Sequence, residues 1–234
     1  MSLLGLLAAS SGAAEEVPAY LTLDSTVHVH MDANSIWANW GVYVPDKGMH
    51  QLTPLVSLAT ATGITYSNTS ITGQSWAGMA SAASDVDAAY DPGKTNVLVV
   101  SETTNSVFGD GKTAAATITD YLTYINGRLA AHPWEYVVMF GTIPRGGQAG
   151  DATNNARLLE VDALVQADLA AHHLDAFFGF RDLSPFYQDG TTRAGFMAST
   201  TTCYESTAPY IHPIGTAREL MASRVAYGLQ RIPV

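Results

Sequence analysis

The chain is poor in cysteine, in charged residues and in long apolar runs. Only one of its 234 residues is a cysteine, Cys203, so no disulfide can form within the chain and packing must hold the fold. Charged residues make up 14%, and 11 Lys and Arg are outnumbered by 21 Asp and Glu, which gives a net charge of −10. This balance argues against nucleic acid or an anionic membrane as a partner. No stretch is long and apolar enough to predict a membrane span.

The N-terminal segment MSLLGLLAASSGAA has the apolar stretch and small residues of a secretion signal, but no Lys or Arg precedes that stretch. We therefore expect residues 1–23 to form an N-terminal docking arm or helix, rather than a cleaved peptide, that contacts virion or cell-surface proteins. Residues 24–234 are expected to form one domain. With 47% hydrophobic residues, the chain can build a sizeable core.

Strand and helix patterns alternate along the chain. Five short segments rich in β-branched or aromatic residues predict strands, namely 27–32, 64–68, 96–101, 136–142 and 175–180. Apolar residues at helical spacing predict helices, with stripes at Ile118, Leu122, Ile125 and Leu129, at Leu158, Val161, Val165 and Leu169, and, after a start near Pro213, at Met221, Val225 and Leu229. This alternation predicts an α/β fold, a three-layer α/β/α sandwich with a five-stranded parallel sheet in flavodoxin-like order. In such folds the active site forms beyond the carboxyl ends of the strands.

Four residues at these predicted strand ends and helix starts supply the parts of an acyl-transfer site. Ser35 follows the first strand, Gly73 the second and Asn105 the third, while His212 precedes the last helix. Acyl transfer needs a hydroxyl nucleophile, a base and donors for the oxyanion. We expect Ser35 to attack and His212 to be the base, kept neutral by the positive end of the helix that follows it. The backbone N–H groups of Ser35 and Gly73 and the side-chain amide of Asn105 would form the oxyanion hole.

The sequence blocks around these residues resemble those of the SGNH/GDSL hydrolase family. ANSIW resembles its serine block, ITGQSW its glycine block, ETTNS its asparagine block and PYIHP its histidine block, in the family's order over about residues 24–230. VVMFGTIPR also resembles the version of the family found in tail-associated proteins of bacteriophages. The resemblance implies a cofactor-independent serine esterase that acts on an acyl ester, on a cell-envelope glycan or lipid. It also implies a virion-associated or extracellular location.

The sequence departs from the family pattern at several positions. Ala33, Asn34, Thr103 and Ser106 replace the family's usual Gly, Asp, Gly and Asp. Pro209 stands where the family has the aspartate that orients the histidine. Orientation of His212 would then come from Glu205, from a backbone carbonyl or from nothing, leaving a Ser-His dyad. The alternative is a catalytically degenerate SGNH-like domain, a structural or glycan-binding component of a phage virion.

Two further patterns carry rival or additional hypotheses. His28 and His30 lie on one face of a predicted strand, and with Asp32 and the pair at 172–173 they resemble the ligands of a metal-dependent amidohydrolase. That fold is an eight-stranded barrel, whereas only five strands are visible, so we expect no metal. Residues 182–206 form a long polar insertion, which favours a substrate-selecting loop or a contact with virion or cell-surface proteins.

Overall fold

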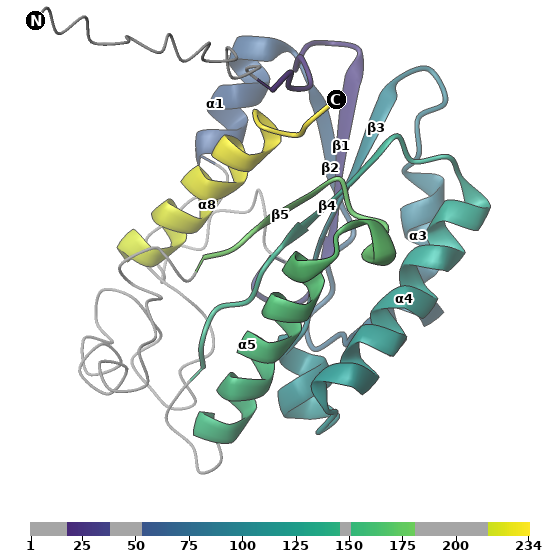
Figure 1. Ribbon diagram of the computed structural model, residues 1–234. Helices are drawn as coiled ribbons and strands as arrows, with labels where there is room; N and C mark the ends of the chain where they lie inside the picture. The colour runs from purple at the N-terminus through teal and green to yellow at the C-terminus, as the bar shows by residue number, and fades with distance from the viewer. Residues whose placement is uncertain (1–17, 38–52, 146–150, 181–214) are drawn as a thin grey trace, which may run out of the picture.

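A parallel sheet forms the centre of the computed structural model, which describes residues 18–37, 53–145, 151–180 and 215–234 (Figure 1). Its five strands are β1 (Val27–Ala33), β2 (Thr65–Asn68), β3 (Thr95–Ser101), β4 (Tyr136–Phe140) and β5 (Ala176–Phe178). They are hydrogen-bonded in the order β2-β1-β3-β4-β5, and every pair is parallel. The predicted α/β sandwich of flavodoxin-like order is therefore confirmed. The fourth and fifth strands are shorter than predicted.

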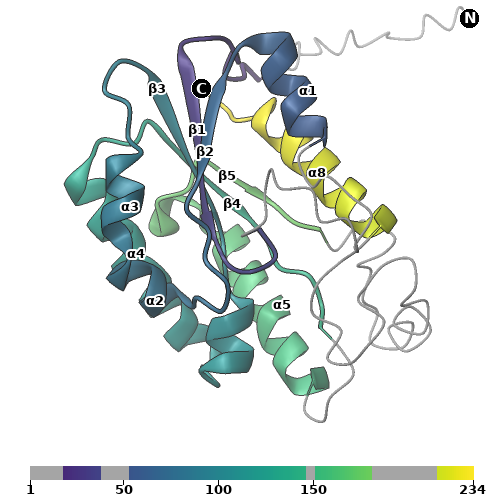
Figure 2. The same ribbon diagram turned by 180° about the vertical axis from the view of Figure 1, so that it is seen from behind.

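Helices cover both faces of the sheet. One face carries α1 (Thr53–Thr62) and α8 (Gly215–Leu229), which contact each other. The other face carries α2 (Trp76–Ser81), α3 (Ala83–Ala88), α4 (Ala114–Ala131) and α5 (Asp151–Ala167), as the two opposite views show (Figure 2). A short π-helix, η2 (Asn105–Gly109), follows β3, and a 3-10 turn, η3 (Ala170–His172), precedes β5. No helix in the described ranges is long and apolar enough to cross a membrane.

Two apolar clusters, one on each face of the sheet, form the core between the sheet and its helices. Side chains alternate along a strand, so Val27, Val29 and Met31 of β1 pack beneath α1 and α8. On β3 the same alternation sends Val97 to this cluster and Leu98 to the cluster beneath α2, α4 and α5. Because every neighbouring pair of strands is parallel, their carboxyl ends lie at a common edge of the sheet.

The predicted helical stripes have different outcomes. Those of α5 and α8 are confirmed at Leu158, Val161, Val165, Met221, Val225 and Leu229, all buried; Leu169 lies just beyond α5 and is half-buried. On α4 the prediction is confirmed at Ile125, which is buried. The rest of the face turned to the sheet is Thr117, Tyr121, Tyr124 and Arg128, which the stripe did not include. Ile118, Leu122 and Leu129 flank that face and are half-buried. The tyrosines can face inward because each hydroxyl finds an acceptor, the His172 carbonyl for Tyr121 and the Asp32 carboxylate for Tyr124.

The two ends of the described chain pair with each other. The Leu21 N–H group donates to the Ile232 carbonyl at 2.8 Å, and Tyr20 and Pro233 form an antiparallel bridge. Leu21 and Leu23 also pack against the cluster beneath α8. Residues 18–23 of the predicted arm thus lie against the domain, while residues 1–17 lie outside the described residues.

Candidate active site

A tight turn places Ser35 directly beyond the end of β1. The Asn34 side-chain oxygen accepts the Ile36 N–H group at 2.9 Å, and the Asn34 carbonyl accepts the Trp37 N–H group at 3.0 Å. Asn68, at the end of β2, donates from its side-chain amide to the Trp37 carbonyl at 3.0 Å. Asn34 and Ile36 are buried, whereas Ser35 between them is partly exposed. The strand ends therefore hold Ser35 at the carboxyl edge of the sheet, the position predicted for a nucleophile.

Gly73 occupies a turn that is attached to the same strand end. The Ile71 N–H group donates to the Ala33 carbonyl at 3.0 Å, so the chain that follows β2 stays hydrogen-bonded to the last residue of β1. The Gln74 N–H group then closes the turn onto the Ile71 carbonyl at 3.3 Å. Gly73 has φ +79°, a conformation that favours glycine, and an added Cβ would meet nothing within 4 Å. Glycine is thus needed here for the turn conformation, and crowding by protein atoms plays no part.

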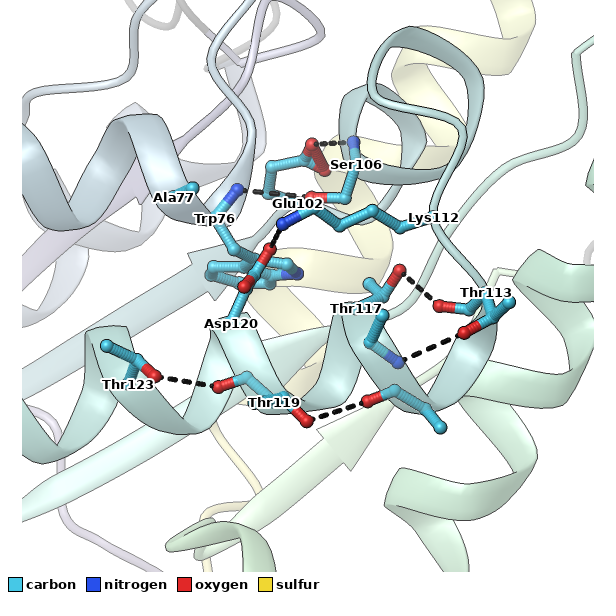
Figure 3. A network of polar contacts seen from close by, with 12 residues as sticks. Trp76, Ala77, Glu102, Ser106, Lys112, Thr113, Thr117, Thr119, Asp120 and Thr123 are labelled. Carbon is cyan, nitrogen blue, oxygen red and sulfur yellow. Dashed lines mark hydrogen bonds and ion pairs between the residues drawn. The ribbon is translucent and has the colours of Figure 1, made fainter.

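Asn105 and Ser106 attach helix η2 to the loop after Gly73. The Asn105 side-chain nitrogen Nδ2 donates to the Gln74 carbonyl at 2.8 Å. The Ser106 hydroxyl accepts the Trp76 N–H group at 3.2 Å, at the first residue of α2 (Figure 3). Ser106, which replaces the family's aspartate, is therefore a helix-end partner for α2. These bonds bring the glycine and asparagine blocks together.

Sequence reasoning missed the buried carboxyl group of Glu102, which directly follows β3. Glu102 is 3% exposed, and its Oε1 accepts the Ser106 N–H group at 2.9 Å (Figure 3). Burial raises the pKa of this carboxyl to about 8, although hydrogen bonds from the Ser106 and Asn105 backbone oppose the shift. The only signal in the sequence was its place directly after a strand whose residues are almost all buried.

A small pocket opens at this edge of the sheet. It lies between the ends of β1, β3 and β4 and the side of α8, and its lining includes Asn34, Trp37, Glu102, Thr142 and Met221. Polar groups from three strand ends thus meet one apolar residue of α8. This position matches the site expected beyond the carboxyl ends of parallel strands.

Two of the predicted site residues, His212 and Glu205, lie outside the described residues. The same holds for Pro209, Cys203 and the insertion at 182–206. Helix α8 begins at Gly215, three residues after His212, so the predicted base precedes a helix whose Met221 lines the pocket. The roles of His212 and Glu205 remain predictions.

The two histidines of β1 are engaged by hydroxyl groups. His28 contacts Thr65 Oγ1 through Nδ1 and Ser67 Oγ through Nε2, both at 2.9 Å. His30 contacts Ser67 Oγ through Nδ1 at 2.7 Å and Thr69 Oγ1 through Nε2 at 2.9 Å. Burial lowers the pKa of His30 to about 3, so the ring is neutral. Within the described ranges, no three His, Cys, Asp or Glu side chains are grouped to hold a metal ion, and the five-stranded sheet is not the barrel of the rival hypothesis.

These contacts form one directed chain of hydrogen bonds, which we name the polar ladder: Lys94, Thr65, His28, Ser67, His30, Thr69, Asp32 and Tyr124. At one end Lys94 Nζ, which can only donate, bonds Thr65 Oγ1 at 2.8 Å. At the other end Asp32 accepts from Thr69 at 3.1 Å and from Tyr124 at 2.7 Å. Each intervening hydroxyl has one hydrogen, so each must donate toward Asp32. Both histidines therefore carry their proton on Nε2.

Comparisons with known proteins match the fold. No protein-family model matches the chain, and no curated protein matches its sequence. Among solved structures, a lipolytic protein of the G-D-S-L family from Veillonella parvula DSM 2008 has a TM-score of 0.59 at 14% identity, covering 86% of this chain and 97% of that one. A carbohydrate esterase of family 3 from Talaromyces cellulolyticus has a TM-score of 0.57 at 14% identity, covering 87% and 96%. The lipase/acylhydrolase from Enterococcus faecalis has a TM-score of 0.57 at 15% identity, covering 87% and 95%. The chain therefore has the α/β fold of the GDSL hydrolases.

Proposed function

We propose that this protein is a serine esterase in which Ser35 attacks the carbonyl carbon of an acyl ester. The observation that carries the proposal is the convergence of three separate sequence blocks at one sheet edge. The turn of Ser35 follows β1, the loop of Gly73 is bonded to the last residue of β1, and Asn105 is bonded to that same loop.

The donors at this edge suit an oxyanion hole. Asn105 Nδ2 carries two hydrogens, and the Gln74 carbonyl accepts one of them, which orients the amide and leaves the second for the substrate oxygen. The backbone N–H groups of Ser35 and Gly73 complete the set. Donors fixed in this way stabilise the charge that develops on the carbonyl oxygen without reorganising during the reaction.

His212 would serve as the base in both halves of the reaction. It takes the hydroxyl proton of Ser35 as the bond to the carbonyl carbon forms, and returns that proton to the leaving alcohol as the ester C–O bond breaks. It then takes a proton from the water that attacks the acyl-enzyme and returns it to Ser35. Glu205 or a backbone carbonyl would orient the ring in place of the family's aspartate.

The substrate class we propose is an acyl ester on a glycan or lipid of a cell envelope. The similar structures include a protein named as a carbohydrate esterase and one named as a lipase/acylhydrolase, which is consistent with either carrier. The virion or extracellular location, with the segments 1–23 and 182–206 as contacts to other proteins, rests on the sequence resemblance alone. The second candidate, a glycan-binding virion domain that has lost the reaction, is favoured by Pro209 in place of the aspartate.

A fluorophosphonate probe separates the two candidates. The wild type should be labelled and should hydrolyse p-nitrophenyl acetate, while Ser35→Ala should do neither and His212→Ala should react far more slowly. Ser81→Ala is the matched control, because Ser81 is an exposed serine of α2 whose hydroxyl donates to the Ala77 carbonyl of the same helix. An unlabelled wild type without turnover, yet with retained glycan binding, would refute the esterase and support the binding domain.

A further inference from the structure

Glu102 contacts the start of η2, the helix that carries Asn105 of the proposed oxyanion hole. Its Oε1 accepts the Ser106 N–H group at 2.9 Å, and the Asn105 N–H group also stabilises the carboxyl. The Asn34 side chain, next to Ser35, adds a weaker stabilisation of the same group. One buried side chain is therefore shared by the turn of the nucleophile and the start of η2.

The second oxygen of this carboxyl has no hydrogen-bond partner of its own in the described part of the chain. This oxygen, Oε2, is buried, while Glu102 lines the pocket with Asn34 and Thr142. A buried polar oxygen without a partner is uncommon and costs stability.

We propose that Glu102 is a positioning residue of the esterase, which holds the Asn105 amide in place relative to the Ser35 turn through its bond to the Ser106 N–H group of η2 and through its place beside Asn34 in the pocket lining. The proposal rests on the esterase function proposed above. Glu102 does not touch the reacting atoms in this role; it acts through Asn34 and Asn105.

The protonation state of Glu102 gives this role a measurable signature. With its pKa raised to about 8 by burial, the carboxyl is neutral at pH 7 and does not oppose a negative oxygen nearby. The charged neighbour that acts on it is Asp110, which raises the pKa further. The groups that line the pocket from the other elements, Asn34 of the β1 turn, Thr142 after β4 and Met221 of α8, carry no charge. Above about pH 8 the carboxyl ionises, and its charge would oppose the forming oxyanion.

The test compares the pH profiles of the wild type, Glu102→Gln and Glu102→Ala in p-nitrophenyl acetate hydrolysis. The wild-type kcat should fall as the pH rises above about 8. Glu102→Gln keeps the acceptor oxygen but cannot ionise, so its kcat at pH 7 should stay within about threefold and the alkaline fall should disappear. Glu102→Ala should lower kcat about 100-fold, the scale of losing an oxyanion donor, with KM little changed.

Glu135→Gln is the matched control. Glu135 also accepts a backbone N–H group, that of Asn96 at 2.7 Å, but it is exposed and lies at the amino end of the strands. This variant should keep both the wild-type rate and the alkaline fall. An alkaline fall that persists in Glu102→Gln would overturn the proposal, as would an unchanged kcat in Glu102→Ala. Fluorophosphonate labelling of the wild type distinguishes failure of the esterase proposal from failure of the Glu102 proposal. An unlabelled wild type refutes the esterase function. A labelled wild type with unaffected Glu102 variants refutes only the positioning role.

Discussion

Replacing Ser67 by alanine should destabilise the protein, because the Ser67 hydroxyl joins the two histidines of the polar ladder. In the wild type it accepts from His28 Nε2 and donates to His30 Nδ1. The variant leaves one donor and one acceptor unpaired, and His30 is fully buried. Water has little access to the His30 ring, so no water molecule can replace the hydrogen bond that Nδ1 loses.

The expected loss follows from the two unpaired groups. Each buried group without a partner costs about 1–3 kcal/mol, and partial hydration of the less deeply buried His28 brings the sum to about 3 kcal/mol. For a chain of this size that corresponds to a fall in Tm of about 6–12 °C. Urea unfolding followed by far-UV circular dichroism measures the difference, with an unchanged m-value showing that the surface exposed on unfolding is the same.

Two matched variants test the reasoning. Thr65→Ala removes a hydroxyl at the exposed end of the ladder, where water can replace it, and should cost less than about 1 kcal/mol. Ser67→Thr keeps the hydroxyl and introduces a β-branched side chain suited to a strand, so it should be nearly neutral. If Ser67→Ala unfolds within about 0.5 kcal/mol of the wild type, the ladder does not stabilise the fold by the bonds described.

The remaining predictions concern two glycines and the oxyanion amide. Gly228→Ala places a Cβ 2.7 Å from a ring atom of Phe178 and should destabilise the protein by about 1–3 kcal/mol. Gly127→Ala, in the interior of α4 with nothing within 4 Å, should instead stabilise it by about 0.5–1 kcal/mol, and equal shifts in thermal melting would contradict this packing. Asn105→Ala should lower kcat about 10²- to 10³-fold in ester hydrolysis. Ser106→Ala loses the bond to the Trp76 N–H group of the same loop but removes no donor to the substrate, so it should lower kcat far less. An equal fall in kcat would contradict the assignment of Asn105 to the oxyanion hole.

The sheet was predictable because its signals are local. Five runs of β-branched and aromatic residues mark the strands, and the alternation with helices implies the parallel arrangement. The Ser35, Gly73 and Asn105 positions could be predicted because they follow strand ends, which share one edge in such a sheet. The hydrogen bonds through Gln74 that link the Gly73 loop to Asn105 could not be predicted, because they depend on the conformation of the loop and not on a repeating sequence pattern.

The inward face of α4 could not be predicted from apolar spacing. Tyr121 and Tyr124 reach the core because their hydroxyls bond groups that are 51 and 92 residues away in the sequence. Without those acceptors the hydroxyl groups of the two tyrosines would favour water. The sequence alone therefore favoured the neighbouring apolar residues as the inward face. Hydrogen bonds from the two tyrosine hydroxyls to residues distant in the sequence therefore set which face of α4 turns inward.

Glu102 and the polar ladder escaped prediction for a related reason. The alternation of His28 and His30 is visible in the sequence, but their partners depend on the register that pairs His30 with Ser67. The burial of Glu102 depends on the ends of β1 and β4 and on α8, all distant in the sequence. Charged and polar residues inside this fold are explained by neighbours that only the folded chain supplies.

The pairing of residues 19–21 with residues 232–234 makes the described chain nearly circular. The Val234 N–H group donates to the Ala19 carbonyl at 3.2 Å. This pairing lies near the amino end of β1, whereas Ser35 follows its carboxyl end (Figure 1). A short peptide linker could join these two segments covalently without strain on the edge that carries Ser35. New ends could then be opened at the exposed turn of Gly111, which would yield a permuted chain with the same order of strands in space.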